Sequence, residues 1–101
     1  MYNSISYLEI RCCFNKSDLK RFTGALQDRD ARRIIMYRNR RYYLTYDSNT
    51  DMFSIMNRDG SCIGILVVGL FRFYVSHAPE IGLNLIWGLL AQLNVYPVTS
   101  L

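Results

Sequence analysis

The charged side chains are distributed very unevenly along this chain of 101 residues. Residues 1–61 carry eleven of the twelve basic and seven of the eight acidic side chains, whereas residues 62–101 carry only Arg72 and Glu80. A small protein that folds alone ordinarily needs charged groups over most of its surface. The C-terminal segment must therefore be buried in the core, covered by a partner or in contact with lipid.

The length favours a single domain over residues 1–101, because typical domains hold about 100–150 residues. Hydrophobic residues make up 50% of the chain and charged residues 20%, which is typical of a globular rather than a disordered protein. The longest apolar runs, residues 62–71 and 81–93, are shorter than the roughly 20 residues that a spanning helix needs. We therefore expect no membrane span.

The cysteines and the first residues indicate a cytoplasmic location. Cys12, Cys13 and Cys62 are odd in number and form no Cys-x-x-Cys motif, which favours buried thiols in a reducing compartment. Residues 1–14 lack the basic segment and apolar run of a secretion signal.

Hydrophobic periodicity predicts a strand and then a helix in the first third of the chain. Residues 4–14 alternate, with Leu8 and Cys12 on the apolar face, as in a half-buried strand. Asn15 is a favourable N-cap for a helix over residues 16–28.

A run of short strands is expected next, over residues 32–37, 41–46, 52–56 and 61–68. The last of these is apolar on both faces and should lie centrally in the sheet. A second helix should follow, capped by Ser76 and ended by Asn94, and a short tail strand should lie at a sheet edge because of Pro97.

Together these elements predict an α+β fold in the order β-α-β-β-β-β-α, with an antiparallel meander packed by two helices. The element order resembles that of TATA-binding-protein-like and helix-grip folds, and residues 40–68 are similar to the early strands of a pleckstrin-homology domain. Both resemblances concern the order of elements and imply no site residue.

The most distinctive cluster is an arginine-rich hairpin. If Asn39 and Arg40 form the turn, Arg38 lies opposite Arg41, and such a like-charge pair costs up to about 1 kcal/mol. An anionic partner would relieve that repulsion, and Tyr43 could stack on a base or pack against a protein. A solvated or salt-bridged tip is the alternative. The candidate partner- or nucleic-acid-binding residues are Arg32, Arg38, Arg40, Arg41 and Tyr43.

The uncharged last helix is the second candidate surface, for self-association or partner docking, through Leu85, Trp87 and Leu89. This predicts a homodimer or another obligate complex. Trp87 with Phe71 and Phe73 could instead line a ligand pocket.

No constellation of catalytic groups is apparent. His77 is the only histidine, and adjacent cysteines on a strand are poor metal ligands. Residues 47–58 begin like a calcium loop but have Met52 where that loop needs glycine. We therefore expect no enzyme activity, cofactor or metal.

These observations favour a small non-enzymatic binding protein, an accessory or inhibitor module of the kind that phages and mobile elements encode. It would occupy a partner protein's surface with the basic hairpin and the apolar helix. Direct nucleic-acid binding by the same hairpin is the alternative, and a small ligand- or lipid-binding domain is the third hypothesis.

Overall fold

The structure is a computed structural model that describes residues 7–24, 32–76 and 82–98. It shows a small α+β fold with an antiparallel sheet and two helices. The strands are β1 (Tyr7–Cys13), β2 (Arg33–Tyr37), β3 (Arg40–Asp47), β4 (Met52–Met56), β5 (Cys62–Val67), β6 (Arg72–Ser76) and β7 (Tyr96–Pro97). The helices are α1 (Lys16–Thr23) and α3 (Leu83–Gln92), and a 3-10 turn, η2 (Val68–Leu70), joins β5 to β6.

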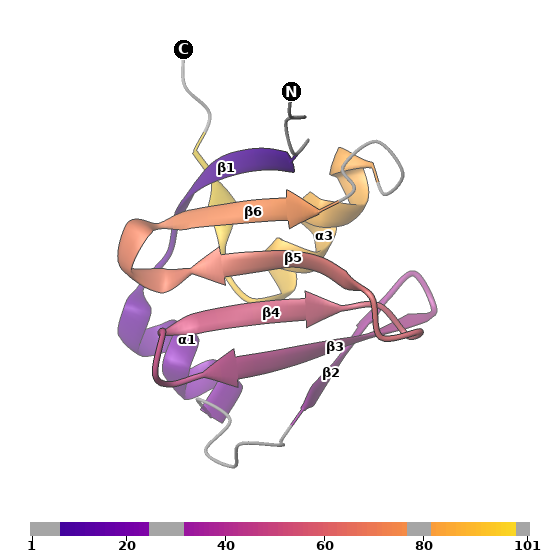
Figure 1. Ribbon diagram of the computed structural model, residues 1–101, viewed down its shortest axis with the longest axis horizontal. Coiled ribbons are helices and arrows are strands. Elements are labelled where there is room, and N and C mark those ends of the chain that lie inside the picture. The colour runs from indigo at the N-terminus through magenta and orange to yellow at the C-terminus, as the bar shows by residue number, and fades with distance from the viewer. Residues whose placement is uncertain (1–6, 25–31, 77–81, 99–101) are drawn as a thin grey trace, which may run out of the picture.

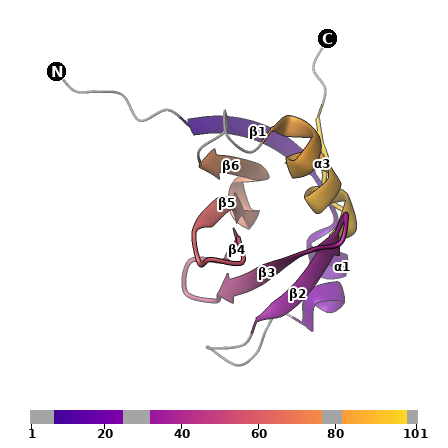
Figure 2. The same ribbon diagram turned by 90° about the vertical axis from the view of Figure 1, so that its right-hand side faces the viewer.

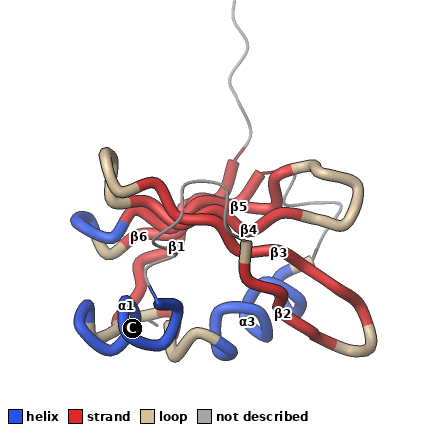
Figure 3. Tube along the Cα trace, turned by 90° about the horizontal axis from the view of Figure 1, so that it is seen from below, coloured by secondary structure: helices blue, strands red, loops and turns tan. Residues whose placement is uncertain are grey.

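All seven strands belong to one sheet in the order β2-β3-β4-β5-β6-β1-β7 (Figure 1). The sheet is strongly curled, and Figure 2 shows it as an open ring with the helices at its mouth. Both helices lie on the same, concave face (Figure 3). The strongly twisted sheet and the helices therefore enclose one core between them.

The core is made by the inward-facing side chains of the strands and the inner side of α3. Helix α3 spans the mouth of the sheet, since it contacts both β2 and β7. It approaches β2 closely because Gly88 has no side chain: a Cβ there would come within 2.2 Å of the Tyr37 ring. The fully buried side chains include Leu44, Phe53, Val68, Phe73, Val75, Leu89, Leu90 and Val95.

The N-terminal predictions are confirmed within the described residues. Cys12 is buried and Cys13 is exposed, so the alternation in β1 is as expected. The Asn15 side chain accepts a hydrogen bond from the Asp18 N–H at 2.9 Å and caps α1. The helix is shorter than predicted because Gly24 adopts a left-handed conformation (φ 70°) and ends it. The rest of the predicted helix, residues 25–28, lies outside the described part of the chain.

The hairpin of β2 and β3 is confirmed, but its predicted register is wrong. The turn residues are Arg38 and Asn39, so Tyr37 pairs with Arg40 and Met36 with Arg41. Arg38 therefore does not lie opposite Arg41, and no like-charge pair crosses the ladder there. The same side chains, Ile35, Tyr42 and Leu44, face the core in either register, because the two registers differ by two residues and the side-chain period is also two.

Two further predictions need correction. The meander contains five strands rather than four, because η2 turns the chain at Gly69 and residues 72–76 form the separate strand β6. Ser76 is the last residue of β6, and α3 has Gly82 and not Ser76 at its N-cap position. Asn94 follows the helix with φ 59°, as an end signal should.

The remaining topological expectations hold. β5 is the central strand of the sheet, and β7 lies at its edge beside β1. None of the helices described is long and apolar enough to cross a membrane.

Gly64 provides a test of the packing between β5 and β6. A Cβ at this position would lie 2.4 Å from the Phe73 ring and 2.8 Å from the Tyr74 carbonyl oxygen. Gly64→Ala should therefore lower the free energy of unfolding by about 1–3 kcal/mol, measured by urea denaturation. Gly69→Ala is the matched control, because open space surrounds that position. Equal stability of the two variants would contradict the packing described.

A second test concerns the link between α1 and the turn from β3 to β4. The Tyr46 hydroxyl donates a 2.6 Å hydrogen bond to Asp51 Oδ1, and Lys20 Nζ lies 3.3 Å from the same oxygen. This hydrogen bond, with some burial, raises the pKa of Tyr46 to about 12. The same bond, followed by Lys20, lowers the pKa of Asp51 below its ordinary 3.8.

Asp51→Asn should lower the free energy of unfolding by about 1 kcal/mol at neutral pH, a value kept small because both ionic groups are partly exposed. Asn tolerates the left-handed backbone at this position (φ 55°). A lowered carboxyl pKa stabilises the fold above 3.8, and this contribution is lost as the pH falls through the folded-state pKa. The raised tyrosine pKa stabilises the fold below 10.0, and this contribution is lost as the pH rises towards about 12. Urea denaturation across the pH range should show the gap between variant and wild type closing at both extremes; a gap independent of pH would contradict the link.

Candidate functional site

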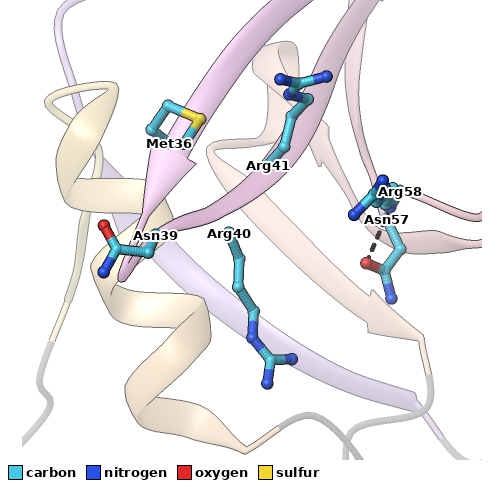
Figure 4. A pocket seen from close by; sticks show the side chains of 6 residues that line it. All are labelled: Met36, Asn39, Arg40, Arg41, Asn57 and Arg58. Carbon is cyan, nitrogen blue, oxygen red and sulfur yellow. Dashed lines mark hydrogen bonds between the residues drawn. The ribbon is translucent and has the colours of Figure 1, made fainter.

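Two turns of the meander meet at one end of the sheet, where they form a basic surface. In a meander every second turn lies at the same end, so the β2–β3 and β4–β5 turns are neighbours (Figure 1). Between them is a hollow of about 370 Å³ (Figure 4). Its lining residues are Met36, Asn39, Arg40, Arg41, Asn57 and Arg58. We call Arg38, Arg40, Arg41 and Arg58 together the basic end.

The β2–β3 turn is tight and carries an arginine in an unfavourable conformation. Arg38 and Asn39 both have positive φ angles, 52° and 62°. This is the two-residue geometry whose twist matches that of a hairpin, and it favours Asn and Gly. Asn39 suits it, whereas a long side chain such as Arg38 is strained there. The Arg38 guanidinium packs over Tyr37, 5.4 Å from the ring centroid.

The β4–β5 turn is held by a set of local hydrogen bonds. Asn57 donates its N–H to the Ser61 carbonyl oxygen at 2.7 Å, and its side-chain oxygen accepts from the Arg58 N–H at 2.9 Å. Asp59 accepts from both the N–H and the hydroxyl of Ser61. These bonds lower the pKa of Asp59. The position of the Arg58 backbone is therefore fixed by the turn.

The arginines of the basic end have no acidic partner among the described residues. The ion pairs recorded there join Lys20 to Asp51, Arg21 to Asp18 and Arg72 to Glu9, all outside the basic end. Successive strand residues point to opposite faces, and Figure 4 shows Arg40 and Arg41 leaving β3 in opposite directions. The guanidinium groups thus spread over an open surface instead of converging on one point. Such an arrangement fits an extended anionic surface better than a single small ion.

The structure places the other predicted hairpin residues beside this surface. Arg32 lies over the Tyr43 ring, with its guanidinium carbon 5.5 Å from the ring centroid. Tyr43 is half-buried, and one face of its ring is partly covered by Arg32. On the same outer face, Ile34 and Met36 of β2 are 52% and 53% exposed. The sheet therefore brings exposed apolar side chains next to unpaired arginines.

Asn57 and Arg58 were not among the predicted site residues, because no local sequence pattern connects them with the arginine-rich hairpin. Their contribution depends on which turns of the meander share an end. That relation follows from strand order, and the antiparallel alternation of strands 33–56 was the signal that could have identified it.

The second predicted surface, on α3, is only partly present. Trp87 is 43% exposed and Leu85 is half-buried. Leu89 is fully buried in the core of its own chain, so a docking role for it is wrong in this fold. Trp87 lines a groove that contains neither Phe71 nor Phe73, which does not support the ligand pocket predicted from these three residues.

The cysteines do not form a reactive centre in the described residues. Burial, with the neighbouring Cys13, raises the pKa of Cys12 to about 11, and burial also raises that of Cys62. Both thiols are therefore less ionised at neutral pH than a free cysteine. Cys13 is exposed, contrary to the expectation of buried thiols. No three His, Cys, Asp or Glu side chains of the described ranges group as metal ligands, and His77 lies outside those ranges.

The strain at Arg38 can be tested directly. Arg38→Asn should raise the free energy of unfolding by about 0.5–1 kcal/mol, because Asn adopts positive φ at lower cost. Arg40→Asn is the control, since Arg40 is not among the residues with positive φ and should gain nothing. Thermal or urea denaturation measures both. A stabilisation of similar size in the control would show that charge removal, and not backbone strain, is responsible.

Comparisons with known proteins give no further guide to this surface: no family model matches the sequence, and no curated protein or solved structure matches the chain.

Proposed function

We propose that this chain is a small non-enzymatic binding protein of the cytosol that docks its basic end on an acidic surface of a partner protein. The observation that carries the proposal is the meeting of two turns that present Arg38, Arg40, Arg41 and Arg58 without an acidic partner in the described residues. The protein acts as an accessory or inhibitor module by covering that partner surface.

The physical basis is a set of exposed guanidinium groups that have no acidic partner in the described residues. A partner that presents carboxylates supplies them with charge-assisted hydrogen bonds, which are stronger than neutral ones. Arginine is also among the residues that contribute most to protein interfaces. The strain at Arg38 is consistent with this role, because strained backbone is concentrated at functional positions.

Exposed apolar side chains favour a protein partner over a nucleic acid. Ile34 and Met36 lie on the outer face of β2, beside Arg41, and are each about half exposed. Protein interfaces combine an apolar centre with a polar rim, whereas nucleic-acid contacts are made largely to phosphates. Nucleic-acid binding through the same arginines is the competing hypothesis.

A charge-reversal variant tests the proposal with defined probes. Poly-L-glutamate stands in for an acidic protein surface, and mixed-sequence DNA and RNA represent the competing hypothesis. Wild type should bind poly-L-glutamate more tightly as salt is lowered, measured by fluorescence anisotropy at two salt concentrations. Arg40→Glu/Arg41→Glu should lower this affinity by about tenfold or more.

The control variant is Lys16→Glu/Arg21→Glu, which makes the same charge change on α1 and should weaken binding much less. Tighter binding of DNA or RNA, lost in the Arg40→Glu/Arg41→Glu variant, would establish the competing hypothesis. Equal losses in both variants would mean that net charge and not the basic end determines binding. Absence of salt-sensitive binding to every probe would refute both hypotheses.

A further inference from the structure

The outer edge of β1 is only partly covered by another strand. β1 pairs with β6 over residues 7–11, whereas β7 pairs with it only at Cys12 and Cys13. One further bond at this edge runs from the Val98 N–H to the Arg11 carbonyl oxygen, at 2.7 Å. In the described residues, no strand of the sheet pairs with this edge of β1 before Arg11.

The backbone groups of Glu9 point to that uncovered edge. The Cys12 N–H bonds to the Phe71 carbonyl oxygen, towards β6, and the Arg11 carbonyl oxygen bonds towards β7. Successive residues of a strand direct their backbone polar groups to opposite edges. The N–H and C=O of Glu9 therefore point to the same side as those of Arg11, beyond the end of β7.

An apolar groove runs beside this edge, between β1 and α3. Its volume is about 270 Å³, and its walls include Leu8 and Ile10 of β1. The opposite side is formed by Leu83 and Trp87, which are 41% and 43% exposed, and Val98 is 44% exposed. Leu83, Trp87 and Val98 thus lie in one solvent-facing groove, next to the Glu9 backbone groups, which pair with no strand in the described residues.

We propose that this groove binds an extended segment of a partner protein, which adds to the sheet as a strand beside β1. A strand supplies the N–H and C=O groups that Glu9 can pair with, whereas a helix has already used its own. The inward side chains of the added strand would pack on Leu83 and Trp87. The proposal rests on different residues from the basic end and does not depend on it.

The charged side chains of β1 indicate which side chains the outer face of the added strand should carry. Glu9 is paired with Arg72, whereas Arg11 has no ion pair in the described residues. Both Glu9 and Arg11 lie on the outer face of β1 and contribute to the lining of the groove. The segment that fits is therefore one that alternates apolar side chains facing α3 with acidic side chains that reach Arg11.

A second copy of the chain fits this edge less well. Antiparallel pairing of two β1 edges centred on Glu9 would place the two Glu9 side chains opposite each other, which is unfavourable. This pairing would also use the Arg11 carbonyl oxygen, which already accepts a hydrogen bond from the Val98 N–H. Pairing centred on Leu8 involves only residues 7–9 of each described strand.

Trp87 is the only tryptophan in the chain, so its emission reports directly on the groove. The probe is a short synthetic peptide in which isoleucine alternates with aspartate, and the control peptide has the same residues in two blocks. The alternating peptide should shift the Trp87 emission to shorter wavelength and slow hydrogen exchange of the Glu9 amide. The block peptide should do neither.

Variants separate the groove from other surfaces in anisotropy measurements with a labelled peptide. Trp87→Ala should lower the affinity by roughly tenfold or more. Tyr96→Ala is its matched control, because Tyr96 is 49% exposed but does not line the groove. Arg11→Glu should weaken binding at the groove. Arg40→Glu/Arg41→Glu should leave the peptide-induced shift of the Trp87 emission close to wild type, because that emission reports on the groove and not on peptide bound at the basic end. Circular dichroism and thermal unfolding confirm that each variant is folded.

Four outcomes would overturn the proposal. The first is an unchanged Trp87 emission and Glu9 exchange rate with the alternating peptide, and the second is equal loss of affinity in Trp87→Ala and Tyr96→Ala. The third is a Glu9 amide that is protected in the free protein until residues 99–101 are removed, which would assign the edge to the chain's own C-terminus. The fourth is a dimer that dissociates on dilution in light scattering and is abolished by Trp87→Ala, which would assign it to a second copy.

Discussion

The packing of α3 across the mouth of the curled sheet is the interaction on which the rest of the structure depends. A sheet that curls this far leaves an apolar concave face that its own strands cannot cover. Helix α3 covers it because its buried residues, Ile86, Leu89 and Leu90, face the core. The approach to β2 is so close that a Cβ at position 88 would displace the Tyr37 ring from its present position. One uncharged helix thus joins elements from both ends of the sheet.

This arrangement determines which parts of the molecule remain available for contacts. Since the concave face is filled by α3 and the core, the surfaces left for contacts are the convex face, the turns, the sheet edges and the outer sides of the helices. The basic end is at the turns, where short loops fixed by Asn39 and Asn57 hold arginines that no described acid neutralises. The groove lies at the other side of the sheet, where no strand of the described residues pairs with the outer edge of β1 before Arg11. Both surfaces consist of side chains and backbone groups that the fold itself does not use.

Local patterns predicted the elements of this fold better than their spatial relations. Alternation identified both faces of β1, and Asn15 marked the start of α1, because these signals act within a few residues. The hairpin register could not be read reliably, since either Arg38-Asn39 or Asn39-Arg40 can be drawn as the turn. The correct choice places an arginine at positive φ, which intrinsic preference argues against. Ser76 was misread for a similar reason: a good capping residue can equally end a strand, and pairing with Tyr7 decides in favour of the strand.

The candidate sites show the same division between local and distant information. Three arginines of the basic end, Arg38, Arg40 and Arg41, come from one hairpin and were visible as a cluster in the sequence, whereas Arg58 joins them only through strand order. Conversely, Leu89 was expected at the surface because α3 carries apolar residues on most of its circumference. Which side of the helix the sheet covers depends on tertiary packing, which local sequence patterns do not show. The contacts of α3 with β2 and β7 determine which side of the helix faces the solvent.

Burial within the chain explains most of the uneven charge distribution. A C-terminal segment with so little charge had to be buried in its own chain, covered by a partner or in contact with lipid, and its described part supplies much of the core. Val68, Phe73, Val75, Ile86, Leu90, Leu93 and Val95 are each at most 2% exposed. Burial within the chain therefore removes most of the need for a partner that the composition implied. The large apolar side chains of this segment that are exposed in the described residues are Leu70, Leu83, Trp87, Tyr96 and Val98, and three of them, Leu83, Trp87 and Val98, line the groove beside β1. The low charge of this segment is thus mainly a requirement of folding, and three of its exposed apolar side chains lie beside a stretch of the β1 edge that no described strand covers.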